Sequence, residues 1–204
     1  MATVKEILNA GSSVQSKYMA SFEELGGVVS LFKASGYKIV LTQGVYDMFH
    51  VGHGRYILEA ASHGDILIIG VDSDELTKSM KGPGRPFDDF DQRIEVLAML
   101  SAVNIIVKRD LGQDKYDLIK LVKPDVLIMS QTTRSFGEED VENLKDFCGK
   151  IEWLEAKAAQ TTTAKLRRMA DEHGLETAKR IVEAMNPVLE PLGAKIQVVV
   201  NGGK

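Results

Sequence analysis

Short runs of consecutive apolar residues recur along the chain and predict buried strands. The run at 65–72 reads DILIIGVD and is apolar at positions that would face both sides of a sheet. A continuous pattern of this kind is typical of a parallel strand that is covered by helices on both faces. Runs of the same kind predict strands at 39–41, 65–72, 103–107, 125–129 and 151–154.

Between these runs, apolar residues recur at helical spacing. The pattern predicts helices at 52–62, 89–100, 114–122, 138–147 and 161–173. Strands that alternate with helices through short connections predict a doubly wound, Rossmann-like parallel α/β sheet.

The two ends of the chain differ from this alternation. Residues 1–35 are polar-amphipathic and predict two helices, the second over 14–33, with a break at the GSS of 11–13. Residues 174–204 predict one further helix and a strand-like run. We therefore expect an N-terminal helical extension over 1–35, an α/β domain over 36–173, and a C-terminal helix-strand extension over 174–204.

Composition narrows the classes of function. The 204 residues are 44% hydrophobic and 26% charged, with a net charge of −4. This balance gives no general attraction to nucleic acid or to an anionic membrane. The single Cys148 excludes an intrachain disulfide and a cysteine-rich zinc site. The start of the sequence lacks an apolar signal core, and no run approaches the ~20 residues of a membrane span. We expect a cytoplasmic protein that binds neither nucleic acid nor membrane.

The most informative segment is 44–60, which follows the first predicted buried strand. Gly44 ends that strand, and His50 and His53 lie three residues apart at the start of a helix, hence on one face. Gly52 between them leaves access to the helix N-terminus, which favours phosphate. Two imidazoles at such a terminus can stabilise charge on a phosphoryl group. Zinc is not expected, because no acidic residue completes a ligand set at motif spacing.

The string GVYDMFHVGH resembles the G-[TS]-F-D-x-x-H-x-G-H signature of the cytidylyltransferase-like nucleotidyltransferases, and the resemblance extends from about residue 37 to 169. It implies that His50 and His53 are catalytic. It also implies a nucleotide-binding role for Gly44, Val45, Tyr46, Asp47 and Gly52. Asp47 either organises a metal ion or fixes the loop.

A basic, Gly- and Pro-rich loop at 76–93 leads into a helix and can close over a triphosphate. Its order K-G-x-x-R-P followed by Q-R is similar to the heptose-1-phosphate adenylyltransferase branch of the same family. The resemblance implies that Lys81 contacts phosphates as a catalytic residue, and that Arg85 and Arg93 lie near the triphosphate. Lys78 is a weaker candidate on the same loop.

A third segment, 159–168, places three threonines where a helix begins. One capping threonine would be ordinary, but three resemble the S-T-T motif of the family, which binds the β- and γ-phosphates. The residues implied are Thr161, Thr162, Thr163 and the following Arg167, with Arg168 as the neighbouring alternative.

Two departures from the family patterns bear on the base. Ala156 stands where cytidylyltransferases for glycerol phosphate and choline phosphate have an arginine. Ser130 and Gln131 follow the strand at 125–129, where the heptose branch has K-G-G-D-Y. We expect both residues to border the base, and Gln131 can read an adenine or a cytosine edge.

The resemblance implies direct attack of a substrate phosphate oxygen on the α-phosphorus of a nucleoside triphosphate. We expect transfer of AMP from ATP to a sugar phosphate, with Mg²⁺ held mainly by the nucleotide phosphates. One alternative is a CTP-dependent cytidylyltransferase for glycerol phosphate or a similar alditol or amino-alcohol phosphate. Another is a non-catalytic nucleotide-binding protein of the same fold. The family's habit implies a homodimer.

Overall fold

The computed structural model describes Ile7, residues 11–131 and 137–155, and, near the C-terminus, Gly174, Glu176, Thr177, 179–183 and Asn186. The chain divides into two compact units, Met1–Ala158 and Ala159–Lys204. The described residues of the second unit are helical.

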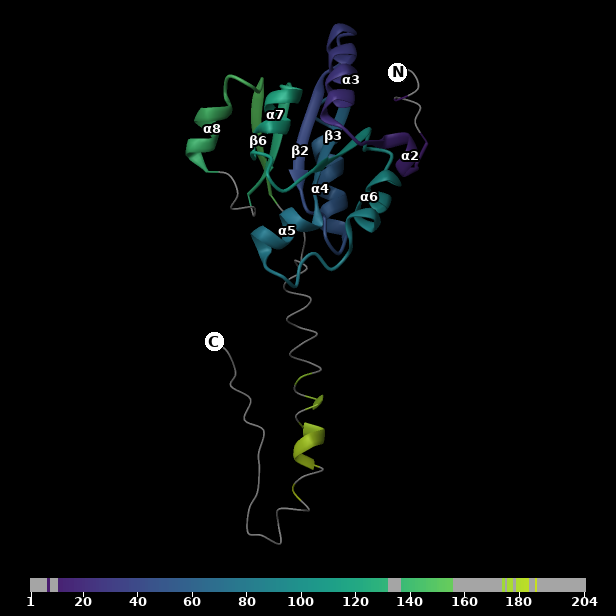
Figure 1. Cartoon of the computed structure of the whole chain (residues 1–204), viewed down its shortest axis with the longest axis vertical. Coiled ribbons are helices and arrows are strands. Elements are labelled where there is room, and N and C mark those ends of the chain that lie inside the picture. Colours follow the sequence, from purple (N-terminus) through teal and green to yellow (C-terminus); the bar gives the residue numbers. More distant parts are fainter. Residues whose placement is uncertain are drawn as a thin grey trace. The chain divides into compact units, whose positions relative to one another are not determined.

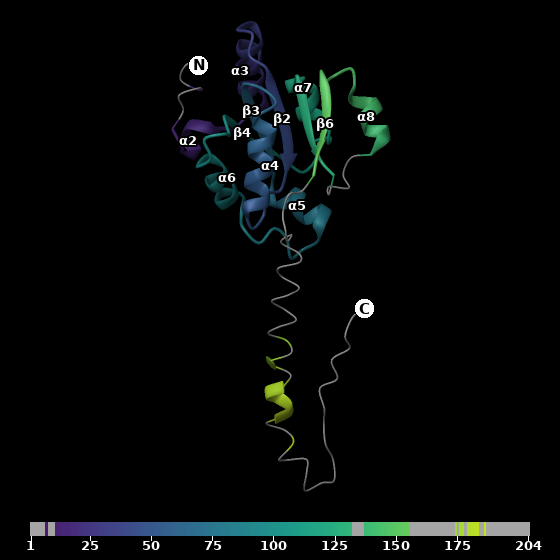
Figure 2. The same ribbon diagram turned by 180° about the vertical axis from the view of Figure 1, so that it is seen from behind.

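Within the described residues of the first unit, six strands form one sheet (Figures 1 and 2). They are β1 (Tyr18–Met19), β2 (Ile39–Gly44), β3 (Ile66–Asp72), β4 (Ile105–Arg109), β5 (Val126–Ser130) and β6 (Lys150–Leu154). Their order is β1-β4-β3-β2-β5-β6, and all neighbouring pairs are parallel. The predicted doubly wound parallel α/β fold is confirmed.

The helices of the described part of this unit connect the strands and cover the sheet. They are α2 (Val14–Lys17), α3 (Phe22–Ala34), α4 (Val51–Ala61), α5 (Asp74–Lys81), α6 (Phe90–Ala98), α7 (Asp117–Val122) and α8 (Glu138–Leu144). None of the helices described here is long and apolar enough to cross a membrane.

Two apolar clusters, one on each face of the sheet, form the core. In β3, Ile66 and Ile68 belong to the cluster that also contains residues of α3 and α7. Leu67 and Ile69 belong to the opposite cluster, together with residues of α4 and α6. Successive side chains of a strand point to opposite faces, so a strand between two helix layers must be apolar throughout.

The N-terminal segment differs from the prediction. The helix expected over 14–33 is interrupted by β1, whose Tyr18 and Met19 pair in parallel with β4. Ser21 then starts α3 by accepting a hydrogen bond from the Glu24 backbone N–H. The buried Lys17 donates to the carbonyl of Leu100. These residues thus extend the sheet instead of forming a separate helical extension. The predicted domain boundary at 173 stays a prediction.

The basic segment also contains an unpredicted helix. Residues up to Lys81 form α5 instead of a loop. Ser73 caps it by accepting from the Leu76 backbone N–H at 3.1 Å, and Asp74 and Glu75 lie in its first turn, where carboxylates are favoured. The loop proper therefore begins at Gly82, whose φ of 96° suits glycine.

The strand order reverses at β2. β3 and β4 extend the sheet on one side of it, and β5 and β6 on the other. In open α/β sheets, ligands bind outside the carboxyl ends of the strands at such a reversal. The carboxyl ends of β2 and β5, which are paired in parallel, therefore lie side by side at the position where a ligand is expected.

Candidate active site

The turn from β2 to α4 has an unusual backbone. Tyr46 and Met48 adopt positive φ angles of 57° and 48°. Left-handed conformations are costly for residues other than glycine and gather at functional sites. The Tyr46 ring lies so close to Gly44 that a Cβ there would come within 3.3 Å of the ring. Gly44 thus makes room for the turn, and the predicted approach of a ligand to this glycine stays a prediction.

The two histidines lie together at the start of α4. His50 is the N-cap, and its Nδ1 accepts a hydrogen bond from the Gly52 backbone N–H at 3.1 Å. Since Nδ1 is an acceptor, a neutral His50 has its proton on Nε2. The rings of His50 and His53 stack with centroids 4.0 Å apart and an interplanar angle of 16°. The spacing of three residues therefore places both imidazoles on one face, as the sequence predicts.

His53 lies among aromatic rings. Tyr46 and Phe49 approach it with centroid distances of 5.7 Å and 5.5 Å. Its Nδ1 is buried and has no hydrogen-bond partner within the described part of the chain. Burial, and then the charges of His50 and Lys81, lower the pKa of His53 to about 4. His53 is therefore a neutral imidazole at neutral pH.

This lowered pKa predicts a pH-dependent stability. The unfolded chain protonates His53 near pH 6.5, whereas the folded chain does so only near pH 4. The free energy of unfolding should therefore fall as the pH falls from 6.5 toward 4, by at most about 3 kcal/mol from this group. Denaturant unfolding of the unmodified chain and of His53→Gln across this range measures the effect. Equal pH slopes for the two proteins would contradict it.

Asp47 holds the loop after α5 against the histidine turn. Its buried carboxylate pairs with Arg85 Nη1 at 2.7 Å and accepts from the backbone N–H groups of Phe87 and Asp88 at 2.9 and 3.0 Å. In return, Asp88 accepts from the Met48 backbone N–H at 2.7 Å. Of the two roles that the sequence left open for Asp47, the structure shows the fixing of the loop.

Lys81 and Arg85 lie at the end of α5 and in this loop. Lys81 is exposed overall, but its ammonium group is partly buried. This partial burial, and then the charge of Arg85, lower the Lys81 pKa. The Arg85 guanidinium lies 4.8 Å from the centroid of the Phe87 ring. Both cations belong to the segment that is docked on the histidine turn, so the structure brings together two of the predicted phosphate-binding groups.

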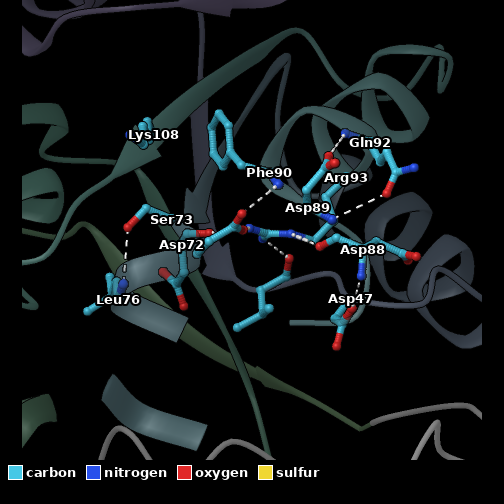
Figure 3. Close-up of polar contacts among 12 residues, drawn as sticks. Asp47, Asp72, Ser73, Leu76, Asp88, Asp89, Phe90, Gln92, Arg93 and Lys108 are labelled. Atoms are coloured by element: carbon cyan, nitrogen blue, oxygen red, sulfur yellow. Dashed lines mark hydrogen bonds and ion pairs between the residues drawn. The ribbon is translucent and has the colours of Figure 1, made fainter. Parts of the chain in front are cut away.

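Arg93 is buried and is bound by other parts of the chain. Its side chain is 0% exposed and is bonded to backbone and carboxylate oxygens of the protein (Figure 3). A fully enclosed guanidinium presents no surface to a nucleotide. Arg93 is thus occupied by the protein itself, and its place near the triphosphate, which the Q-R motif implied, stays a prediction.

The remaining predicted residues fall into two groups. Ser130 ends β5, and the exposed Gln131 follows it with its backbone N–H bonded to the Leu154 carbonyl at 3.1 Å. Both lie at the carboxyl end of β5, the strand beside β2, where the strand order reverses. The predicted phosphate-binding residues Thr161, Thr162, Thr163 and Arg167 lie outside the described residues.

Sequence reasoning did not identify the role of one acidic residue of this region, Asp88. Asp88 bonds the Met48 backbone N–H, and Asp74 bonds both Arg93 and the backbone N–H of Phe90. The three acidic residues Asp88, Asp89 and Asp91 were a signal here, but they indicated only the start of a helix. Among the described residues, no group of three or more His, Cys, Asp or Glu side chains could hold a metal ion.

The fold and the site together define a class. A doubly wound sheet that reverses at β2 and presents a histidine-bearing helix N-terminus there has the arrangement at which open α/β proteins bind anionic ligands. Residues 41–174 match the model of the cytidylyltransferase-like family, and the chain belongs to that family. The family predicted from the histidine motif is thereby confirmed.

Curated relatives support the same assignment. The bifunctional protein HldE of Sulfurimonas denitrificans is 34% identical over 158 residues, which cover 76% of this chain and 32% of the relative. HldE of Vibrio vulnificus is 37% identical over 142 residues, which cover 63% of this chain and 29% of the relative. The chain thus spans about a third of the length of these relatives.

A solved structure supports the fold alone. The lipopolysaccharide core biosynthesis protein from Thermoplasma volcanium superposes with a TM-score of 0.53 at 24% identity. The match covers 60% of this chain and all of that one.

Proposed function

We propose that this chain transfers AMP from ATP to a sugar phosphate and releases pyrophosphate. The observation that supports this most is the stacked His50–His53 pair at the N-terminus of α4, beside the reversal of strand order. A helix N-terminus and two imidazoles supply hydrogen-bond donors where negative charge develops on a phosphoryl group.

In the proposed reaction, a phosphate oxygen of the acceptor attacks the α-phosphorus of ATP. A new P–O bond joins acceptor and AMP, the bond between the α-phosphorus and the bridging oxygen breaks, and pyrophosphate leaves with that electron pair. The Nε2–H of His50 and the neutral His53 would stabilise the charge on the α-phosphoryl oxygens. A covalent enzyme intermediate is not needed.

Lys81 and Arg85 would hold the leaving pyrophosphate, and the predicted threonine cluster at 161–163 would assist them. Mg²⁺ supplies charge neutralisation when it is bound with the triphosphate. Because Asp47 already accepts three hydrogen bonds from the loop, we propose that the nucleotide phosphates provide most of the metal ligands.

A pyrophosphate-release assay with ATP, CTP, GTP and UTP against a panel of phosphate acceptors tests this function. We expect turnover with ATP and a sugar-1-phosphate. Turnover with CTP and an alditol phosphate would support the cytidylyltransferase alternative. Nucleotide binding without pyrophosphate release across the panel would support the non-catalytic alternative. The cytoplasmic location and the homodimer stay predictions.

A preference for adenine over cytosine predicts that ATP and CTP stabilise the folded protein to different extents. The K-G-x-x-R-P…Q-R order and the alanine at 156 favour ATP. A site that hydrogen-bonds one base rejects another, because its polar groups are then left unpaired. We therefore expect ATP with Mg²⁺ to raise the thermal midpoint more than CTP does. A higher thermal midpoint with CTP and no change with ATP would contradict the proposed adenylyltransferase activity.

A further inference from the structure

Arg93 joins three segments that are distant in sequence. Its Nη1 donates to the Val45 carbonyl at 2.6 Å, immediately after β2. Its Nη2 donates to the Asp72 carbonyl at 2.8 Å, at the end of β3, and to the Asp74 carboxylate at 2.7 Å. Its Nε donates to the Asp88 carbonyl at 3.1 Å. Figure 3 shows the guanidinium between Asp72 and Asp88.

Each of these segments leads to a group of the candidate active site. Val45 precedes the turn that ends at His50. Asp72 precedes α5, which ends at Lys81. Asp88 belongs to the loop that Asp47 holds through its backbone N–H. The position of one side chain thus sets the spacing between the histidine turn and the loop with the basic residues.

Only arginine can make this set of bonds. Its planar fork has N–H groups on three nitrogens, and all three nitrogens are used here. Lysine donates from a single nitrogen and cannot reach acceptors on three sides. Replacing Arg93 would leave buried carbonyl oxygens unsatisfied at the ends of two adjacent strands.

We propose that Arg93 is a positioning residue, which holds the histidine turn and the Lys81–Arg85 segment in register and does not contact the nucleotide. This inference rests on the proposed function, because the groups that Arg93 positions are those assigned there to the nucleotide. Its principal readout is nucleotide affinity, so that it can be judged even if turnover with the acceptors tested is absent.

The experiment is a double-mutant cycle of Arg93→Lys and Arg85→Ala, with the dissociation constant of ATP–Mg²⁺ measured by calorimetry. CTP replaces ATP if the unmodified chain binds it more tightly. Arg93→Lys alone should weaken binding about 10-fold or more. If Arg93 acts by placing the Arg85 loop, its replacement in the Arg85→Ala background should cost far less.

Three further variants separate positioning from stability. Val28→Ala removes buried volume in α3, away from the site, and should lower stability while leaving nucleotide affinity unchanged. Arg55→Lys, at an exposed position of α4, controls for the exchange itself. Asp74→Asn keeps Arg93 but removes its ion-pair partner, so it should weaken nucleotide binding several-fold even if Arg93→Lys does not fold.

The results decide the proposal in either direction. Losses that are less than additive in the cycle, together with weakened binding by Asp74→Asn, support it. Fully additive losses would indicate a direct contact with the nucleotide and overturn it. Unchanged affinity in folded Arg93→Lys, or in Asp74→Asn where Arg93→Lys does not fold, would also overturn it. Absent turnover in the unmodified chain would count against the proposed function and leave the binding cycle readable.

Discussion

His50→Ala and His53→Ala should each lower kcat by about 10²-fold or more, while the fold is retained. Removing one preorganised donor to a developing oxyanion costs about 3–4 kcal/mol in comparable sites. The two rings stack at 4.0 Å, so the loss of either also removes a contact that orients the other. Because the pair acts as a unit, the double variant should be little worse than the more damaged single variant.

Steady-state kinetics of pyrophosphate release measures this effect. His63→Ala is the matched control, since it removes an imidazole beyond the other end of α4. Circular dichroism and the thermal midpoint establish that each variant is folded. Near-normal turnover in both folded histidine variants would reject the catalytic assignment.

Lys81→Ala and Arg85→Ala should weaken the binding of the nucleoside triphosphate by about 10-fold or more and that of the monophosphate much less. Both cations are assigned to the β- and γ-phosphates, which the monophosphate lacks. Lys81→Ala is the cleaner variant. Arg85→Ala also leaves the buried carboxylate of Asp47 without its ion-pair partner and should lower stability as well.

Calorimetric titration with the triphosphate and the monophosphate of the same nucleoside tests this prediction. Lys120→Ala, an exposed position on α7, is the control for loss of a positive charge. Equal losses for the two nucleotides would mean that the basic segment binds something other than the phosphates.

Strands β2 to β6 and most helices of the sheet unit could be predicted from the sequence because each depends on a local pattern. The seven residues of β3 are all buried. A short, nearly continuous apolar run of this kind is typical of a parallel strand that is covered on both faces. The arrangement of the two histidines could also be predicted, since a helix fixes the relative position of residues three apart. Two-residue β1 was not predictable, because its existence depends on pairing with β4, some ninety residues later.

The role of Arg93 could not be predicted for a similar reason. The Q-R motif identifies an arginine but not the direction of its guanidinium. That direction depends on where the carbonyls of Val45 and Asp72 lie after folding. The role of Asp88 could not be predicted from its neighbours in sequence, because Asp89 is the residue that caps α6, by accepting from the Gln92 backbone N–H.

The reciprocal bonds between the histidine turn and the basic loop affect how this site can be rebuilt. Asp47 accepts from the backbone of Asp88, and Asp88 accepts from the backbone of Met48. Each of the two hydrogen bonds therefore depends on the backbone conformation of the opposite segment. A loop grafted from a relative would keep its docking only if the matching turn were transferred with it. For protein engineering, these two segments are one transplantable module, although some forty residues separate them in the chain.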